Sequence, residues 1–348
     1  MSEDVWSASD TTPDAIEAAL RELLRQRHAV DEATAPARVL NLIVVVDRSW
    51  KGEIANRLER VGRYHASRTV LCAVEEGRDT IDAVAAVGYD KTEGSISVIR
   101  EQVEIDMGPE HLAALDTIVD PVIVSELQTM LWCPHGHQEA VEALSGMIDV
   151  MLLDSDDPDD VVDSLGDAAE LLRSAYVVDL AWLRTTPWRE RLASSFDPPD
   201  RLAALAHFSA VHIRHRPGSS ASALLLAGWL SSRLGWQPTT LSTNGQDAIH
   251  GVAHAGDHDV EIVLELRDQA AAGLAGVTVD CGTELSLSLD RAQGGLRARE
   301  RSGGTERSWQ VLGASRGEGG ILGEGVRQAM LRDPTYGPAL AAAQEFCP

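Results

Sequence analysis

The segment that most constrains the fold is a continuous apolar run, RVLNLIVVVD, over Arg38–Asp47. A strand buried on both faces needs such a run, whereas a half-exposed strand alternates apolar and polar residues. A helical pattern follows over Glu53–Tyr64, and a second apolar run, SRTVLCAVE, over Ser67–Glu75. This strand–helix–strand order predicts a βαβ unit, and hence a sheet of the α/β class.

The rest of the first half continues this alternation. Pro13–Val30 has apolar residues at helical spacing, with Pro13 at the first helical position. Further strands are expected at Asp82–Tyr89, Ser95–Ile105, Pro121–Leu131 and Asp149–Asp154, and further helices at His135–Ser145 and Pro158–Ser174. Together these elements predict an N-terminal α/β sheet domain over residues 1–174.

Beyond Pro198 and Pro199 the pattern changes. Leu202–Arg216 predicts a strand, and Ser220–Leu234 an apolar helix. Short runs with a period of two, typical of antiparallel strands, follow at Asp259–Leu266, Gly276–Cys281 and Glu284–Asp290. Helical patterns at Gly323–Arg332 and Pro334–Ala343 come last. We therefore expect a second, α+β domain over residues 175–348 that contains an antiparallel sheet.

The charge of the chain excludes several classes of partner. Its 348 residues include 54 acidic and 30 basic side chains, for a net charge of −24. Such a field repels nucleic acid and anionic membrane surfaces. The apolar runs are far shorter than the ~20 residues of a spanning helix, and the acidic N-terminal residues lack a signal-peptide pattern. We expect a soluble, cytoplasmic protein that binds neither nucleic acid nor membranes.

One segment, DLAWLRTTPWRERLASSFDPP over Asp179–Pro199, is rich in Trp and Arg in a chain otherwise poor in aromatics. These residue types dominate the energetics of protein interfaces. The segment therefore predicts partner-binding residues, namely Trp182, Arg184, Trp188 and Arg189. The alternative is that the two tryptophans brace the junction between the domains and that the arginines pair with nearby carboxylates.

Two histidine clusters are weak candidates for a metal site. Cys133, His135 and His137 lie within five residues, but an intervening Pro and Gly make it hard for all three to face one ion. His250, His254 and His258 recur every fourth residue, but Gly251 and Gly256 favour a polar hairpin over a helix. We expect no metal at either place.

A better candidate site joins the strand ending near Arg216 to the helix beginning at Ser220. Backbone N–H groups at a helix start can bind an anion, and nearby arginines reinforce this. The predicted anion-binding residues are Arg214, Arg216, Gly218 and Ser219. No G-x-G-x-x-G, Walker, G-x-S-x-G or H-E-x-x-H motif accompanies them, so the sequence predicts no cofactor and no catalytic residues.

The segment Asp179–Asp197 resembles the pattern D-L-x-W-x-R-x-x-P-W-R-x-x-L-A-x-x-F-D of the glucose-6-phosphate dehydrogenase assembly protein family, OpcA. LLLAGWLSSRLGW, over Leu224–Trp236, is similar to that family's apolar helix. Weaker similarities are VLNLIVVV, the stretch HASRTV at His65–Val70 and RDPTY at Arg332–Tyr336. The resemblance implies a non-catalytic effector that promotes assembly or activity of glucose-6-phosphate dehydrogenase, in the oxidative pentose phosphate pathway.

Two other functions stay open from the sequence. The first is an enzyme or sensor that binds a sugar phosphate through the helix N-terminus near Ser219. The second is a purely structural subunit of an unrelated complex. Binding of sugar phosphates would distinguish the first from the effector, and the partners recovered from a lysate would distinguish the second.

Overall fold

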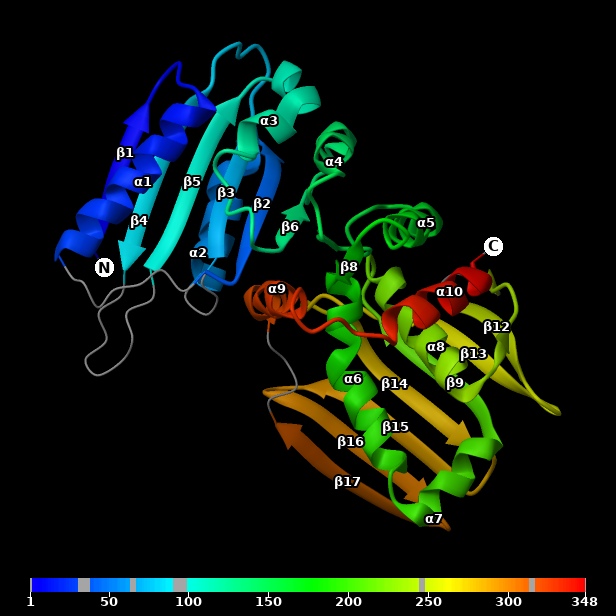
Figure 1. The fold of residues 1–348 in the computed structure, drawn as a ribbon. Coiled ribbons are helices and arrows are strands. Elements are labelled where there is room, and N and C mark those ends of the chain that lie inside the picture. Colours follow the sequence, from blue (N-terminus) through cyan, green and yellow to red (C-terminus); the bar gives the residue numbers. More distant parts are fainter. Residues whose placement is uncertain are drawn as a thin grey trace. The chain divides into compact units, whose positions relative to one another are not determined.

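The computed structural model describes residues 2–30, 38–62, 67–89, 99–243, 248–312 and 317–347. The chain forms two compact units (Figure 1): unit 1 is Met1–Leu153 with Ser174–Val178, and unit 2 is Asp154–Arg173 with Asp179–Pro348. Residues 154–173, expected in the N-terminal domain, belong to unit 2 because α5 (Val161–Leu171) packs on α8 (Ser220–Leu234) and α10 (Tyr336–Phe346). Among the helices of the described residues, none has the length and apolar character needed to cross a membrane.

Unit 1 is built on an eight-stranded sheet in the order β1-β4-β5-β3-β2-β6-β7-β8. The central strands β5, β3, β2, β6 and β7 pair in parallel, and β1 and β4 are antiparallel. The strands are β1 (Ser2–Ala8), β2 (Leu40–Asp47), β3 (Ser67–Val74), β4 (Asp82–Tyr89), β5 (Ile99–Met107), β6 (Thr129–Trp132), β7 (Val150–Leu153) and β8 (Tyr176–Asp179). The apolar run of β2 is buried from Leu40 to Val46, so the predicted α/β sheet is confirmed.

Helices surround this sheet and connect its strands. They are α1 (Pro13–Val30), η1 (Arg48–Trp50), α2 (Lys51–Gly62), η2 (Pro109–Ala114), α3 (Leu115–Val119) and α4 (Gln138–Leu144). Helix α4 begins later than the predicted His135 because Gly136 and His137 both have positive φ, which interrupts a helix.

The strand predicted at Pro121–Leu131 is wrong for most of its length, since β6 begins only at Thr129. The preceding turn is held by Asn41, the one polar residue inside β2. Its fully buried side chain donates to the carbonyl of Val124 at 2.9 Å and accepts from the Val124 N–H at 3.0 Å. A side chain thus supplies hydrogen bonds that a strand partner would otherwise supply.

Unit 2 contains a nine-stranded sheet in the order β10-β12-β13-β9-β14-β15-β16-β17, with β11 beside β12. Among the described strands of this sheet, every pairing is antiparallel except that of β13 with β9, so the predicted antiparallel sheet is confirmed. The strands are β9 (Phe208–His215), β10 (Gln237–Pro238), β11 (Ser242–Thr243), β12 (Ala248–Ala255), β13 (His258–Leu266), β14 (Leu274–Cys281), β15 (Leu285–Ala292), β16 (Gly295–Ser302) and β17 (Thr305–Leu312).

The strand predicted at Leu202–Arg216 is wrong in its first half. Leu202 ends the short helix α7 (Pro199–Leu202), and the 3₁₀ helix η3 (Ala203–His207) follows. Pro199 occupies the first helical position, where its missing N–H and fixed φ favour a helix start. The strand β9 begins only at Phe208.

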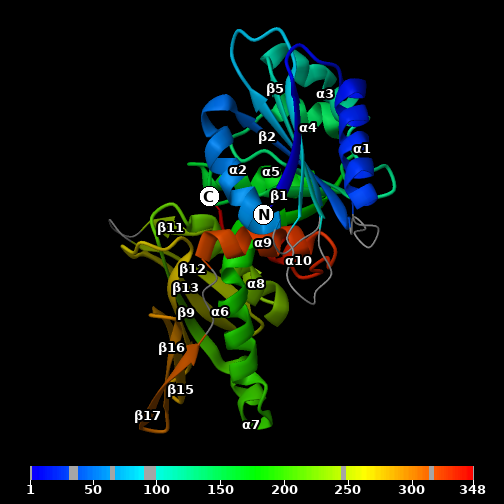
Figure 2. The ribbon, with the colours of Figure 1, turned by 90° about the vertical axis from the view of Figure 1, so that its left-hand side faces the viewer.

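Two long helices, α6 (Leu180–Phe196) and α8, cover one face of the unit 2 sheet (Figures 1 and 2). Helix α10 packs against α8, and a Cβ on Gly228 would collide with the carbonyl of Ala339. Glycine at this position therefore permits the close approach of the two backbones. Helix α9 (Gly317–Gln328) packs against α6.

Candidate functional site

The candidate site in unit 2 is built around the start of α6. Asp179 caps this helix by accepting from the Ala181 N–H at 2.9 Å. The same carboxylate accepts from the N–H and the hydroxyl of Ser155, at 3.1 and 2.7 Å, and from the Tyr336 hydroxyl at 3.0 Å. Burial raises the pKa of Asp179 to about 6, although these hydrogen bonds favour its charged form. The Asp179 carboxylate thus connects the start of α6 to Ser155 and to Tyr336, which lie far from it along the chain.

Arg184, one turn further along α6, lies among three carboxylates. Its guanidinium donates to both oxygens of Asp154 at 2.6 Å and to Glu318 at 2.7 and 3.3 Å, and it lies 3.6 Å from Asp156. Burial would lower the pKa of Arg184, but the hydrogen bonds with Asp154 and Glu318 outweigh it and raise that pKa. The side chains of Asp154 and Asp156 are each only 5% exposed. The positive charge of Arg184 offsets the cost of burying these two carboxylates.

Trp182 and Arg189 form a second cluster on α6. The Trp182 indole N–H donates to Asp333 at 2.9 Å, and its ring lies 5.6 Å from that of Tyr336. The Arg189 guanidinium lies 3.5 Å from the centre of the Trp182 ring, and its Nε donates to the Thr185 hydroxyl at 2.9 Å. Burial lowers the pKa of Arg189 to about 10. This stacked arginine and ring fix α6 against the segment that precedes α10.

Trp188 is the largest fully buried side chain of the described residues. Its indole N–H has no hydrogen-bond partner among them, so the ring contributes through apolar packing and not through a hydrogen bond. The preceding residue, Pro187, has no N–H and therefore donates no helical hydrogen bond to the carbonyl of Leu183.

All four predicted partner-binding residues therefore lie inside unit 2. Trp182 and Trp188 are 2% and 0% exposed, and Arg184 and Arg189 have side chains 8% and 11% exposed. The structure brings Trp182, Arg184 and Arg189 together with Asp333 and the Asp154 turn. Arg189 also donates to the Thr186 hydroxyl at 3.0 Å and lies 3.5 Å from Asp333.

The predicted anion-binding residues are divided between strand β9 and the turn that leads into α8. Arg214 lies within β9 and points away from α8, since its neighbours Ile213 and His215 are the buried ones. Arg216 and Gly218 lie in the exposed turn, and the Ser219 hydroxyl accepts from the Gly273 N–H at 2.9 Å. The four residues do not converge on one site.

The N-terminus of α8 already holds an anion, and that anion is Asp156. Its carboxylate accepts from the Ser222 N–H at 3.0 Å and from the Ser222 hydroxyl at 2.6 Å. Burial raises the pKa of Asp156 to about 7, against the hydrogen bonds from Ser222 that lower it. A carboxylate of the chain itself thus occupies the place predicted for a phosphate.

The raised pKa of Asp156 predicts that the stability of the protein depends on pH. Because the folded-state pKa of Asp156 is raised above the unfolded value of about 3.8, the free energy of unfolding falls as the pH rises from about 4 to 7. Asp156→Asn removes this titration. The free energy of unfolding should therefore fall less between pH 5 and pH 8 in this variant than in the wild type, with a difference on the order of 2 kcal/mol.

Urea denaturation of the full chain at several pH values measures the slope of this free energy against pH. The control is Asp160→Asn, which alters an exposed carboxylate that caps α5 and should leave the slope as in the wild type. A wild-type slope in Asp156→Asn would contradict the assignment of the titration to this residue.

Neither histidine cluster is arranged as a metal site. Cys133, His135 and His137 lie in the loop between β6 and α4, where His137 Nε2 is 3.3 Å from Asp47 and His135 stacks on Trp50. The predicted polar hairpin at His250–His258 is confirmed as β12 and β13 with a turn at Gly256, and His258 Nε2 lies 3.0 Å from the Phe208 carbonyl. Within the described part of the chain, no three His, Cys, Asp or Glu side chains are grouped as metal ligands.

In unit 1, the sheet order reverses beside β2, whose neighbours are β3 and β6. Ligands of open α/β sheets bind outside the carboxyl ends of the strands at such a point. Here β2 ends at Asp47 and is followed by Arg48-Ser49-Trp50-Lys51; the first glycine, Gly52, already lies within α2, so the glycine-rich turn that lets a backbone approach a pyrophosphate is missing. Trp50 is 42% exposed, and its ring stacks on His135 with the centroids 4.6 Å apart. Lys51 is held by Asp106 and Glu104, at 2.8 and 3.0 Å.

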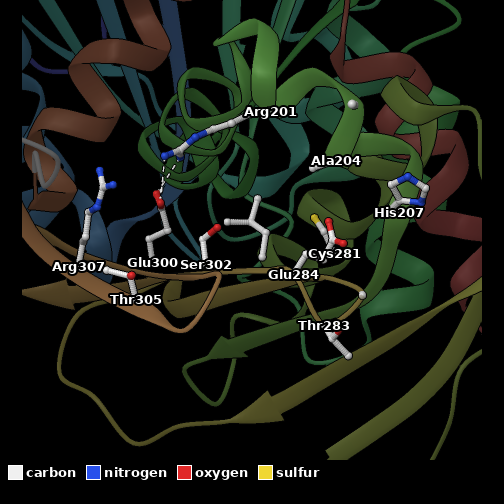
Figure 3. A pocket seen from close by; sticks show the side chains of 13 residues that line it. Arg201, Ala204, His207, Cys281, Thr283, Glu284, Glu300, Ser302, Thr305 and Arg307 are labelled. Atoms are coloured by element: carbon white, nitrogen blue, oxygen red, sulfur yellow. Dashed lines mark hydrogen bonds and ion pairs between the residues drawn. The ribbon is translucent and has the colours of Figure 1, made fainter.

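A polar pocket of about 660 Å³ lies in unit 2 beside the turn between β14 and β15. Figure 3 shows its main charged pair, Arg201 and Glu300, pointing toward each other, with Arg307 and His207 further apart. The Arg201 guanidinium donates to both Glu300 oxygens, at 2.8 and 3.0 Å. The other charged lining residues, Glu284 and Arg307, have opposite signs, so the formal charge of the lining favours neither an anion nor a cation.

Sequence reasoning missed the carboxylates that surround α6. The acidic run Asp154–Asp160 leads into the helix predicted at Pro158–Ser174, and Asp160 caps α5 by accepting from the N–H groups of Val162 and Asp163. Asp154 and Asp156 instead face Arg184 and Ser222, which lie 30 and 66 positions away along the chain. No local spacing could have indicated these pairs.

Comparisons with known proteins cover both halves of the chain. Residues 58–170 match the family model of the glucose-6-phosphate dehydrogenase subunit N-terminal domain, and residues 175–340 match that of its C-terminal domain. A protein named for the OxPP cycle as OpcA, from Synechococcus elongatus, is 29% identical over 190 residues, which are 50% of this chain and 41% of that protein. Its namesake from Synechocystis sp. is 26% identical over 226 residues, covering 63% of this chain and 47% of that protein. The chain thus spans less than half the length of these relatives.

A solved structure shares the fold without shared sequence. KijD10, a 3-ketoreductase from Actinomadura kijaniata in complex with NADP and TDP-benzene, aligns with a TM-score of 0.52 and 8% identity, over 88% of this chain and 95% of that one. At this identity the likeness concerns the fold alone. The two family models, which between them match residues on both sides of α6, and the OpcA relatives show that the chain belongs to the OpcA family of glucose-6-phosphate dehydrogenase assembly proteins.

Proposed function

We propose that this chain is a non-catalytic effector that promotes the assembly or activity of glucose-6-phosphate dehydrogenase in the oxidative pentose phosphate pathway. The observation that carries the proposal is the match of two dehydrogenase-subunit domain models over residues 58–170 and 175–340. The relatives named for the OxPP cycle agree with that pathway. The dehydrogenase is the partner that these names imply.

The geometry at the carboxyl end of β2 supports a non-catalytic role. A dinucleotide needs a glycine-rich turn so that the backbone and a helix N-terminus can meet its phosphates. This chain has Trp50 and Lys51 there, and Glu53 places a negative charge in the first turn of α2. Lys51 is engaged by Asp106 and Glu104, so it is not available to bind a phosphate. The residues present do not fit the NADP that KijD10, the reductase of similar fold, binds.

The surface we propose for the dehydrogenase is the stack of Trp50 on His135. Exposed aromatic rings that are held in a fixed orientation are typical anchors of protein interfaces. The Asp47 carboxylate, 3.3 Å from His137, and the Arg48 side chain, 3.6 Å from Asp106, add charged groups beside the stack. The buried residues Trp182, Arg184, Trp188 and Arg189 of α6 would support the effector by fixing the fold of unit 2.

The test is capture of the dehydrogenase of the same organism by the full-length chain, with its activity measured with and without the chain. Wild-type protein should capture and activate the enzyme. Trp50→Ala should weaken binding at least about tenfold, as expected of an interface anchor. Trp309→Ala, which truncates a tryptophan of matching exposure on β17, is the control and should change affinity less than about twofold. Failure of the wild-type chain to bind the dehydrogenase would overturn the proposed function, and equal effects of the two variants would overturn only the surface.

A further inference from the structure

We propose that the open face of the unit 2 sheet carries a binding pocket for a phosphate monoester, centred on Arg214. The pocket has a volume of about 310 Å³ and lies over the strands β9, β14, β15 and β16. Its lining residues are charged or hydroxyl-bearing: Arg214, Thr278, Ser286, Ser288, Asp290, Arg299 and Arg301. This inference goes beyond the effector function and does not depend on it.

The position of the pocket follows from strand register. Thr278 pairs with Ser288, and Ser288 with Arg299, so these side chains stand in a row across three strands. Ser286 and Arg301 form the next pair along the same face. Side chains two apart on a strand share a face, and this face is the one opposite the helices α6 and α8 (Figure 2). The pocket is therefore lined by side chains that point away from the core of unit 2.

Arg214 forms a fixed base for the pocket. Its guanidinium donates to the Thr278 hydroxyl at 3.1 Å and to Asp290 at 2.9 Å. The arginine lies over Gly276, where a Cβ would come within 2.5 Å of its Nη2 and 2.8 Å of the Asp290 carboxylate. Gly276 thus leaves the space in which this ion pair lies. Guanidinium N–H groups held in a fixed plane suit the oxygen geometry of a phosphate.

The charge of the pocket selects an anion. Its three arginines and one aspartate give a formal net charge of +2 (three positive minus one negative), or +1 when the neighbouring Glu306 is included, in a chain whose net charge is −24. Among the described residues, Arg299 approaches a carboxylate only at 3.7 Å, that of Glu306, and Arg301 forms no ion pair. The hydroxyls of Ser286 and Ser288 add donors and acceptors for the remainder of the ligand. The volume is at the lower end of the range for small-molecule sites.

The test is calorimetric titration of the full chain at low ionic strength with glucose 6-phosphate as the monoester and glucose as the uncharged counterpart. Saturable binding of the ester, and none of glucose, is expected. Arg301→Gln should weaken binding about tenfold, as the loss of one charge-assisted hydrogen bond implies. Arg307→Gln removes the same charge from the opposite face of the same hairpin, and it should change binding less than about twofold.

A second variant tests the base of the pocket. Gly276→Ala places a methyl group against Arg214 and Asp290 and should weaken binding at least as much as Arg301→Gln does. Circular dichroism and the melting transition of each variant establish that the sheet remains folded. Absence of saturable binding in the wild type, or an equal loss in Arg307→Gln, would overturn the proposal. Because the readout is binding to the isolated chain, neither outcome bears on capture of the dehydrogenase.

Discussion

Trp188→Ala is expected to lower the free energy of unfolding of unit 2 by about 3 to 5 kcal/mol, the range for truncating a buried Trp. The ring is fully buried beside Pro187, so the cavity would open at a turn of α6 that already lacks one backbone hydrogen bond. Trp188→Phe keeps most of the volume and removes an indole N–H that has no partner among the described residues. It should cost less than about half as much as the alanine variant.

Hydrogen exchange followed by mass spectrometry measures this effect in unit 2 alone, because the protection of amides in α8 and α10 reports its opening. Trp309→Ala, at 40% exposure, is the matched control and should change that protection by less than about 1 kcal/mol. If Trp188→Ala loses the proposed activation of the dehydrogenase while the protection of α8 stays as in the wild type, then Trp188 contacts the partner and does not act through the fold.

Arg184→Met is expected to lower the free energy of unfolding by about 3 to 5 kcal/mol at pH 8, the range for breaking a buried ion pair. The substitution leaves Asp154 and Asp156 buried without their cation. Since the pKa of Asp156 is already raised to about 7, its carboxyl group gains a proton readily as the pH falls. The loss relative to wild type should therefore shrink between pH 8 and pH 5.

Urea denaturation at pH 5 and pH 8 measures this difference. The control is Arg21→Met, which removes an exposed arginine paired with Glu17 on α1 and should cost less than about 0.5 kcal/mol at either pH. Arg184→Met could instead lower the free energy of unfolding equally at both pH values. That result would show that Arg184 stabilises the fold through packing of its side chain and not by neutralising buried carboxylates.

The parts of the fold that sequence predicts well are those whose pattern is local. The run in β2, the helix Pro13–Val30 and the strand Asp82–Tyr89 have the predicted bounds or nearly so, because periodicity alone distinguishes them. The first half of Leu202–Arg216 and the turn before β6 depend on Pro199 and on the Asn41 side chain. The latter contact joins residues 83 positions apart, so no window of sequence contains it.

The contacts of the candidate sites also join residues far apart in the sequence, so local patterns do not predict them. The Trp and Arg content of α6 identified the segment, but its burial depends on Asp333 and Glu318, which lie more than 130 positions further along the chain. For Arg214 the signal was present: β9 continues through His215, and strand alternation then turns Arg214 away from α8. The predicted anion site grouped Arg214 with Arg216, Gly218 and Ser219 by closeness in sequence, although Arg214 lies within the predicted strand Leu202–Arg216.

The division of the chain into two units has a consequence for dissecting the protein. The backbone passes from one unit to the other three times, after Leu153, after Arg173 and after Val178. A fragment that stops at Leu153 lacks β8, the edge strand of its sheet, while one that stops at Val178 carries α5 without the helices that cover its apolar side. No single cut yields two self-sufficient pieces, so isolating either half calls for a circularly permuted or loop-replaced design.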